Sequence, residues 1–306
     1  MRAATTALVC AALALGGCTR EPGSTSLTRG TLIVECDESV YPVIKTEAEV
    51  FLRQYPDSKI TVRSVQAREA TANFVNDSVR VIICARPLNA EERGALATTN
   101  VQVDSYLVAR SAVAVITHKD NPSGQLRFGE VESLFTGGIT RWNRMRGKPL
   151  VDLYIGGIDC SINEIFRGQA LGGKAFALSA TPVGESDLLV EKVRKSPGGI
   201  GIVSPAWLKG VATELNVPAL GSPTWRPDTL ALPGQYYTPA QGYVYLAYYR
   251  YIAPVYIYSR EIDRNLSLGF ISFVCSAPGQ KIIQEGGLVP ARMPVRILQL
   301  TSNQVN

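Results

Sequence analysis

The chain has 306 residues, enough for about two domains that each bury a core of their own. Hydrophobic residues make up 46% and charged residues 19%, with a mean hydropathy of +0.07, which excludes a disordered tail and an integral membrane bundle. The net charge of +5 is too dilute to indicate a nucleic-acid partner. The chain has a single histidine, His118, so that a catalytic triad or a histidine metal site would depend on this one residue.

Residues 1–17 have the order of a secretory signal, with Arg2, then an apolar run too short to span a bilayer, then small residues up to Cys18. The tetrad Leu15-Gly16-Gly17-Cys18 resembles a bacterial lipobox. This resemblance implies cleavage before Cys18, lipidation of that cysteine and a lipid-anchored tether over residues 18–30. The alternative is an ordinary signal peptide that happens to contain Cys18.

Four cysteines remain after such processing, and they allow three disulfide pairings in an oxidising compartment. They are Cys36, Cys84, Cys160 and Cys275. None has the spacing of a metal site, so we expect no metal and no other cofactor. Cys36 and Cys84 each end an apolar run, which leaves buried free thiols or one disulfide between strands as alternatives.

The rest of the chain alternates apolar runs with amphipathic stretches. We predict strands over residues 31–36, 60–65, 79–85, 113–117, 150–155 and 200–203. We predict helices after Ser39 and over residues 68–75, 128–135, 163–170, 186–195 and 267–285, the last of which Pro278 interrupts. This alternation predicts an α/β protein with open sheets and helices on both faces.

Nine of the 13 tyrosines lie between Tyr236 and Tyr258. Tyr243, Tyr245, Tyr249 and Tyr251 have even spacings, so an extended segment would present them on one face. Such a row would either stack on a sugar or organic ligand or cover a half-buried strand, and β-propensity favours the second alternative.

Four phrases of the sequence are distinctive: "ICARPL" (83–88), "SLFTGGITRWN" (133–143), "SPGGIGIVS" (196–204) and "GFISFVCSAPGQKIIQEGGLVPA" (269–291). Together they resemble the PstS-like phosphate-binding lipoproteins of ABC importers. The resemblance implies a two-lobe periplasmic binding protein type II fold with two crossing hinge strands, over 108–116 and 245–258. Lobe 1 would then be discontinuous, over residues 31–110 and 248–306, and lobe 2 would cover 111–247.

The resemblance also implies an anion site in the cleft, where the carboxyl ends of parallel strands meet the amino ends of helices. The first predicted loop holds Glu38 and Ser39, and the second holds Ala85 and Arg86. Ser39 would donate a hydroxyl or serve as a helix N-cap, and Arg86 would grip an oxyanion or form a surface salt bridge. Ala85 stands where a serine is usual in the family.

The third loop departs most from the family pattern. Cys160, Ser161 and Ile162 occupy the place of a Ser-Gly-Thr phrase, and Gly156 and Gly157 lie where an arginine is expected. One hydroxyl and one cation are therefore missing together, which weakens the case for phosphate itself.

The negative charge of the first loop repels an anion, unless a carboxylate accepts the proton of a protonated oxyanion. Asp37 and Glu38 supply that charge. We expect both side chains to point into solvent.

A nucleophilic role for Cys160 at a helix amino end is disfavoured, because His118 is expected to be exposed in a turn away from it. We therefore predict no enzyme activity. The sequence predicts a monomeric lipoprotein of the bacterial periplasm or cell surface that captures phosphate or another oxyanion and delivers it to an ABC permease. Its only membrane contact would be the lipid anchor. The alternative is a degenerate scaffold without the phosphate site, which binds an envelope partner or takes part in sensing.

Overall fold

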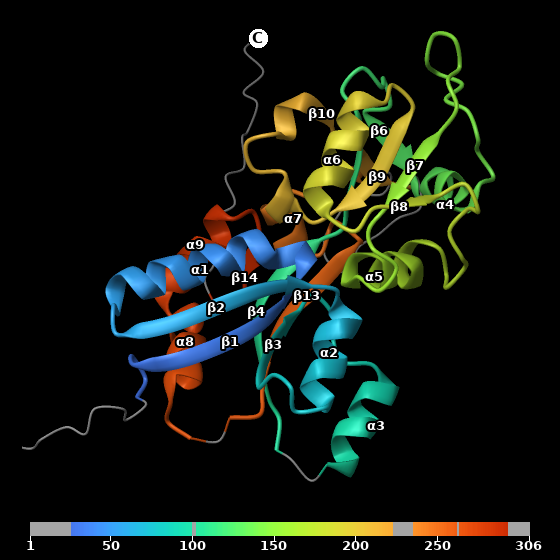
Figure 1. Ribbon diagram of the computed structural model, residues 1–306. Helices are drawn as coiled ribbons and strands as arrows, with labels where there is room; N and C mark the ends of the chain where they lie inside the picture. Colours follow the sequence, from blue (N-terminus) through green and yellow to red (C-terminus); the bar gives the residue numbers. More distant parts are fainter. Residues whose placement is uncertain (1–25, 100–101, 223–234, 262, 293–306) are drawn as a thin grey trace, which may run out of the picture.

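The structure, a computed structural model, describes residues 26–99, 102–222, 235–261 and 263–292. The predicted signal peptide, Cys18 and most of the predicted tether lie outside these residues. Figure 1 shows two bodies, one around the blue strands β1 and β2 and the other around the yellow-green strands β7 and β9, with the orange strand β13 running between them.

The first sheet has six strands in the order β14-β4-β13-β3-β1-β2. These strands are β1 (Gly30–Asp37), β2 (Ser58–Val65), β3 (Val81–Cys84), β4 (Asp104–Ala112), β13 (Ile252–Ser259) and β14 (Val289–Pro290). Strand β1 pairs in parallel with both β2 and β3, because the helices between these strands return the chain to the same end of the sheet. The carboxyl ends of the three strands therefore lie at one edge.

The second sheet repeats this plan in the order β10-β5-β9-β7-β8. Its strands are β5 (Ala114–His118), β7 (Asp152–Ile155), β8 (Thr181–Pro182), β9 (Gly199–Val203) and β10 (Leu215–Asn216). Strand β7 pairs in parallel with β8 and β9, and the next strand, β5, is antiparallel, as β13 is in the first sheet. A small third sheet contains β6 (Gln125–Arg127), β11 (Ala219–Gly221) and β12 (Tyr236–Tyr237).

Helices cover both faces of the first sheet, as the sequence predicts. The helices of the structure are α1 (Tyr41–Gln54), α2 (Ala67–Val75), α3 (Ala90–Thr98), α4 (Phe128–Thr136), α5 (Ser161–Ala170), α6 (Ser186–Lys195), α7 (Gln241–Tyr245), α8 (Leu266–Cys275) and α9 (Ala277–Glu285), with short 3-10 turns η1 (Glu38–Val40), η2 (Pro205–Trp207) and η3 (Ala212–Glu214). Side chains alternate across a strand, so Ile83 of β3 packs with α1 and α8 while Ile82 packs with α2 and α3.

Two crossing segments join the sheets. Strand β4 ends at Ala112 and β5 begins at Ala114, so the chain passes from the first sheet to the second at Val113. The Val113 amide donates to the Tyr251 carbonyl over 2.9 Å, and the Tyr249 hydroxyl donates to the Val113 carbonyl over 2.8 Å. These bonds fasten the first crossing to the segment that returns through β13.

The prediction of one extended tyrosine row is wrong. Tyr243 and Tyr245 lie in the short helix α7, where their exposed fractions are 41% and 43%, whereas Tyr249 and Tyr251 are buried beside the crossing. A helix of 3.6 residues per turn cannot keep evenly spaced side chains on the same face as the strand that follows it.

Two further differences, and one confirmed prediction, have local causes. Helix α3 was not predicted, although Asn89 caps it in a reciprocal capping box with Glu92. His118 is buried rather than exposed, because it ends β5 and pairs with Leu215 of β10. The break at Pro278 is confirmed, since α8 ends at Cys275 and Pro278 lies in the first turn of α9.

Among the described residues, no single helix has the length and apolarity to cross a membrane. Helices α8 and α9 reach those values only as a pair, across a bend of 64°.

The two most specific family phrases meet inside the second body. The Trp142 indole N–H donates to the Gly198 carbonyl over 2.9 Å, and the Asp152 amide donates to the same oxygen over 3.0 Å. A Cβ atom at Gly198 would lie well inside contact distance of the Leu150 carbonyl oxygen, so this close approach requires glycine. The residues of these two phrases therefore stabilise the second body.

Candidate functional site

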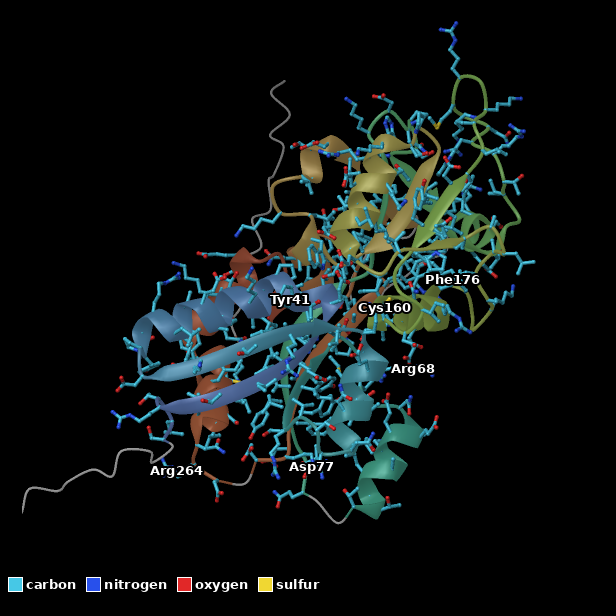
Figure 2. All side chains as sticks on the ribbon, viewed as in Figure 1. Tyr41, Arg68, Asp77, Cys160, Phe176 and Arg264 are labelled. Atoms are coloured by element: carbon cyan, nitrogen blue, oxygen red, sulfur yellow. The ribbon has the colours of Figure 1, made fainter. Side chains whose placement is uncertain are left out.

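The candidate site lies where the carboxyl ends of the parallel strands of both sheets face each other. From the first sheet, β1 leads into η1 and β3 leads into the loop of Arg86. From the second sheet, β7 leads through a glycine loop into α5, and β8 leads into α6. Figure 2 shows Tyr41, Arg68 and Cys160 close to the junction of the two bodies. The predicted loops thus come together.

Asp37 occupies two backbone donors at the first two predicted loops. Its carboxylate is fully buried and accepts the backbone N–H groups of Ser39 and Ala85, each over 3.1 Å. The expectation that Asp37 and Glu38 point into solvent is wrong, because both are buried and hydrogen-bonded inside the cleft. An internal carboxylate thus already satisfies these two loop amides.

Ser39 is buried, and its hydroxyl has no hydrogen-bond partner among the described residues. The N-cap alternative for Ser39 is wrong, because the side chain of Asp37 caps η1 and Val40 is the uncapped N-cap of α1. A buried hydroxyl without a partner is costly, so this group is available to a ligand.

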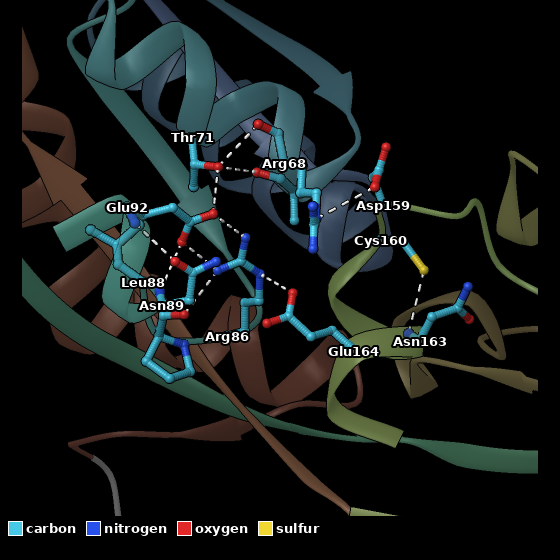
Figure 3. Close-up of polar contacts among 12 residues, drawn as sticks. Arg68, Thr71, Arg86, Leu88, Asn89, Glu92, Asp159, Cys160, Asn163 and Glu164 are labelled. Carbon is cyan, nitrogen blue, oxygen red and sulfur yellow. Dashed lines mark hydrogen bonds and ion pairs between the residues drawn. The ribbon is translucent and has the colours of Figure 1, made fainter. Parts of the chain in front are cut away.

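Arg86 is a buried cation held by carboxylates from both bodies (Figure 3). Its two terminal nitrogens bond the Glu92 carboxylate over 2.8 and 2.6 Å, and its Nε lies 3.0 Å from a Glu164 oxygen of α5. The alternative of a surface salt bridge is wrong, since the side chain is 1% exposed.

The contacts of Arg86 and Glu92 keep both side chains ionised. Burial opposes ionisation of the Arg86 guanidinium, but the Glu92 hydrogen bond and the Glu164 and Glu92 charges hold its pKa above the ordinary value. Burial likewise opposes ionisation of Glu92, yet bonds from Arg86 and the Asn89 amide lower the pKa of that carboxyl.

The third predicted loop begins α5. Cys160 is the N-cap of this helix, and its sulfur accepts the Asn163 amide over 3.4 Å. Burial raises the pKa of the Cys160 thiol, so it stays neutral and is a weak cap. Ser161 is fully buried, and its hydroxyl has no partner among the described residues, while Ile162 is a buried apolar residue.

A side chain at either glycine in place of the family arginine would displace a neighbouring side chain. A Cβ atom at Gly156 would lie 2.7 Å from the Cys160 sulfur, and one at Gly157 would lie 2.5 Å from Gln66 Oε1. The Asn163 amide group donates to both glycine carbonyls over 2.9 Å and thereby fixes the loop.

Glu38 reaches across the cleft to the amino end of α6. One carboxylate oxygen accepts the Ser186 amide over 2.8 Å and the other accepts the Ser186 hydroxyl over 2.9 Å. The Glu38 carbonyl also accepts the Trp207 indole N–H over 3.0 Å. Burial raises the pKa of the Glu38 carboxyl to about 7, against the lowering effect of the Ser186 bonds.

A cavity of about 480 Å³ lies beside this contact. Its charged and aromatic lining consists of Glu38, Glu69, Glu185, Asp187, Tyr41 and Trp207, and none of the described lining residues is Lys, Arg or His. This cavity is therefore acidic. Among the described residues no group of His, Cys, Asp and Glu is arranged to hold a metal ion.

The two sheets have the arrangement of the periplasmic binding protein type II fold, and comparisons with known proteins agree. The family model described as a PBP superfamily domain matches residues 22–278. The chain therefore belongs to the PBP superfamily.

Three relatives illustrate this likeness. Protein SphX of Synechococcus elongatus is 23% identical over 277 residues, which cover 87% of this chain and 79% of SphX. A Clostridium perfringens structure, described as a phosphate ABC transporter substrate-binding protein with bound phosphate, has a TM-score of 0.72 at 20% identity and covers 86% of this chain and 100% of its own. An ABC-type phosphate transport receptor from Vibrio cholerae has a TM-score of 0.64 at 17% identity, with coverage of 86% and 100%.

Sequence reasoning missed the acidic partners and the α6 contact. The spacing Asn89-x-x-Glu92 is a capping-box signal, so Glu92 could have been placed at the start of a helix beside Arg86. No local signal marks Glu164 or Ser186 as site residues, because their contacts join segments far apart in the sequence.

Proposed function

We propose that this chain is an extracytoplasmic solute-binding lipoprotein that captures phosphate or a related oxyanion in the cleft and delivers it to an ABC permease. The descriptions of the Clostridium and Vibrio structures support phosphate as the ligand class. We further propose that the protein is not an enzyme. The candidate nucleophile, the Cys160 thiol, is buried and neutral.

The observation that carries this proposal is a set of buried donors at the predicted loops. Ser39 and Ser161 are each at most 1% exposed, and both hydroxyls lack a partner among the described residues. They come from opposite sides of the cleft, together with the buried cation Arg86. Two unpaired hydroxyls and a guanidinium suit a tetrahedral oxyanion.

The remaining parts of the proposal concern processing and domain division. Residues 1–17 would be removed, Cys18 would carry the lipid anchor, and the protein would act as a monomer at the periplasmic or outer surface of a bacterial membrane. Lobe 1 would comprise residues 31–110 and 248–306, and lobe 2 residues 111–247. The passage of the chain between sheets at Val113 supports the first boundary.

A second candidate is a scaffold that has lost the oxyanion site and serves a partner-binding or sensing role. One observation favours it: the Asp37 carboxylate already accepts the Ser39 and Ala85 amides, and Glu92 and Glu164 already pair with Arg86. An oxyanion would have to compete with these internal carboxylates.

Calorimetric titration of the chain from Glu21 onward, after unfolding and refolding to remove carried-over ligand, tests both candidates with phosphate, sulfate and molybdate. For the first candidate, Ser161→Ala or Ser39→Ala should weaken binding at least about tenfold, because each removes one donor. Ser58→Ala is the control, since this buried serine lies at the start of β2, far from the carboxyl ends of the strands. If no oxyanion gives heat, the second candidate replaces the first.

A further inference from the structure

The contact between Glu38 and Ser186 joins the two bodies through a buried carboxyl. Glu38 belongs to η1, which follows the first sheet, whereas Ser186 and Trp207 belong to α6 and η2 beside the second sheet. With the two bodies in contact, as in the structure, Glu38 is 7% exposed and both of its carboxylate oxygens are bonded. Separation of the bodies would break all three contacts and return the carboxyl to water.

The groups that face Glu38 are acidic or neutral. Asp37 precedes it, Glu69 faces the same cavity from α2, and Glu185 and Asp187 face it from the start of α6. The neighbouring thiols, Cys36 and Cys160, have pKa values raised by burial and stay neutral. No cation compensates the carboxylate among the described lining residues, so the closed cleft disfavours its ionised form.

The neutral form of Glu38 satisfies the same partners. Its carbonyl oxygen can accept the Ser186 amide, and its hydroxyl can donate to Ser186 Oγ, which is either donor or acceptor. Protonation therefore removes the buried charge without loss of the contact across the cleft.

We propose that Glu38 is a proton-coupled latch: closure of the cleft takes up a proton on this carboxyl, so that closure, and with it oxyanion capture, is favoured by acid. The oxyanion half rests on the proposed function, whereas the closure half stands without it. A bound anion would act in the same direction, because it repels ionised Glu38.

The direction of the pH dependence follows from linkage. The pKa of Glu38 rises from 4.5 to about 7 on burial, so the closed form holds a proton that the open form releases. The contribution to closure is full below pH 4.5 and is lost as the pH rises to about 7. Within this window the closing equilibrium should change by up to about tenfold per pH unit.

Small-angle scattering across this pH range tests the closure half without any ligand. The radius of gyration of the wild-type chain should increase as the pH rises towards about 7, and Glu38→Gln should abolish the change. Glu69→Gln is the matched control, since it removes an equal charge from the same cavity but from an exposed side chain of α2. A pH response that is equal in wild type and Glu38→Gln would overturn the latch.

Titration with sulfate, which does not change protonation in this range, tests the oxyanion half. Proton uptake is obtained from binding heats in two buffers of different ionisation enthalpy. Wild type should take up more protons per sulfate than Glu38→Gln, and equal uptake would overturn the coupling. If neither sulfate nor phosphate binds while closure still depends on Glu38 and pH, the proposed oxyanion function fails and the latch stands.

Discussion

Replacement of Arg86 by alanine should reduce the free energy of unfolding by about 3–5 kcal/mol, because it breaks a buried ion pair and leaves one partner behind. The variant loses two bonds to Glu92, one to the Pro87 carbonyl and the ion pair with Glu164. The stranded carboxylate, Glu92, has a side chain that is 12% exposed. Its bonds from Thr71 and Asn89 remain but carry no positive charge.

Urea denaturation followed by circular dichroism measures this loss. Arg68→Ala is the control, because Arg68 pairs with Asp159 over 3.5 Å at an exposed site and should cost less than about 1 kcal/mol. The double variant Arg86→Ala/Glu92→Gln should recover at least about 1 kcal/mol, since it removes the stranded charge. Equal losses for Arg86→Ala and Arg68→Ala, or no recovery in the double variant, would refute the reasoning.

The remaining predictions concern single residues elsewhere in the two bodies. Ser161→Ala should leave the unfolding free energy unchanged or raise it by up to about 1 kcal/mol, because the lost hydroxyl has no partner among the described residues. Gly198→Ala should cost about 1–3 kcal/mol, because its Cβ meets the Leu150 carbonyl, whereas Gly168→Ala in α5 meets nothing and should gain up to about 1 kcal/mol. Burial raises the pKa of Glu47 to about 9, so stability should fall from pH 4.5 to about 9 by up to about 1.4 kcal/mol per unit, and Glu47→Gln should flatten this fall. A thiol reagent should modify the half-buried Cys275 before Cys160.

For each of these predictions, a specific result would contradict it. Denaturation curves would contradict the first two if Ser161→Ala lost more than about 1 kcal/mol, or if both glycine variants changed stability alike. Curves recorded at several pH values would contradict the third if wild type and Glu47→Gln kept the same pH slope. Mass spectrometry of the labelled chain would contradict the last if Cys160 reacted first.

The order of strands and helices was largely predictable, because burial imposes a period of two on strands and 3.6 on helices. The prediction of α6 over 186–195 agrees with the structure, and the break at Pro278 follows from the missing N–H of proline. Helix α7 was missed because five residues are too few to display a helical period among closely spaced tyrosines.

The site was only half predictable from the sequence. Loop positions could be inferred, because parallel strands bring their carboxyl ends to one edge, and the cleft indeed gathers Glu38, Ser39, Arg86 and Ser161. Their roles as ligands remain predictions. The sequence pattern could not show which group each charged side chain of the site would pair with.

The sequence by itself determined the alternation of elements and the residues at the strand ends, since both depend on local spacing. Only the tertiary structure decided that Asp37 faces two loop amides, that Glu164 of α5 reaches Arg86, and that Glu38 meets Ser186. The Glu38 and Ser186 contact spans 148 residues. A hydrogen bond depends on the distance between two atoms in space, and a contact of this kind produces no periodic pattern in the sequence. Its consequences for charge and protonation therefore appear only when the positions of both bodies are known.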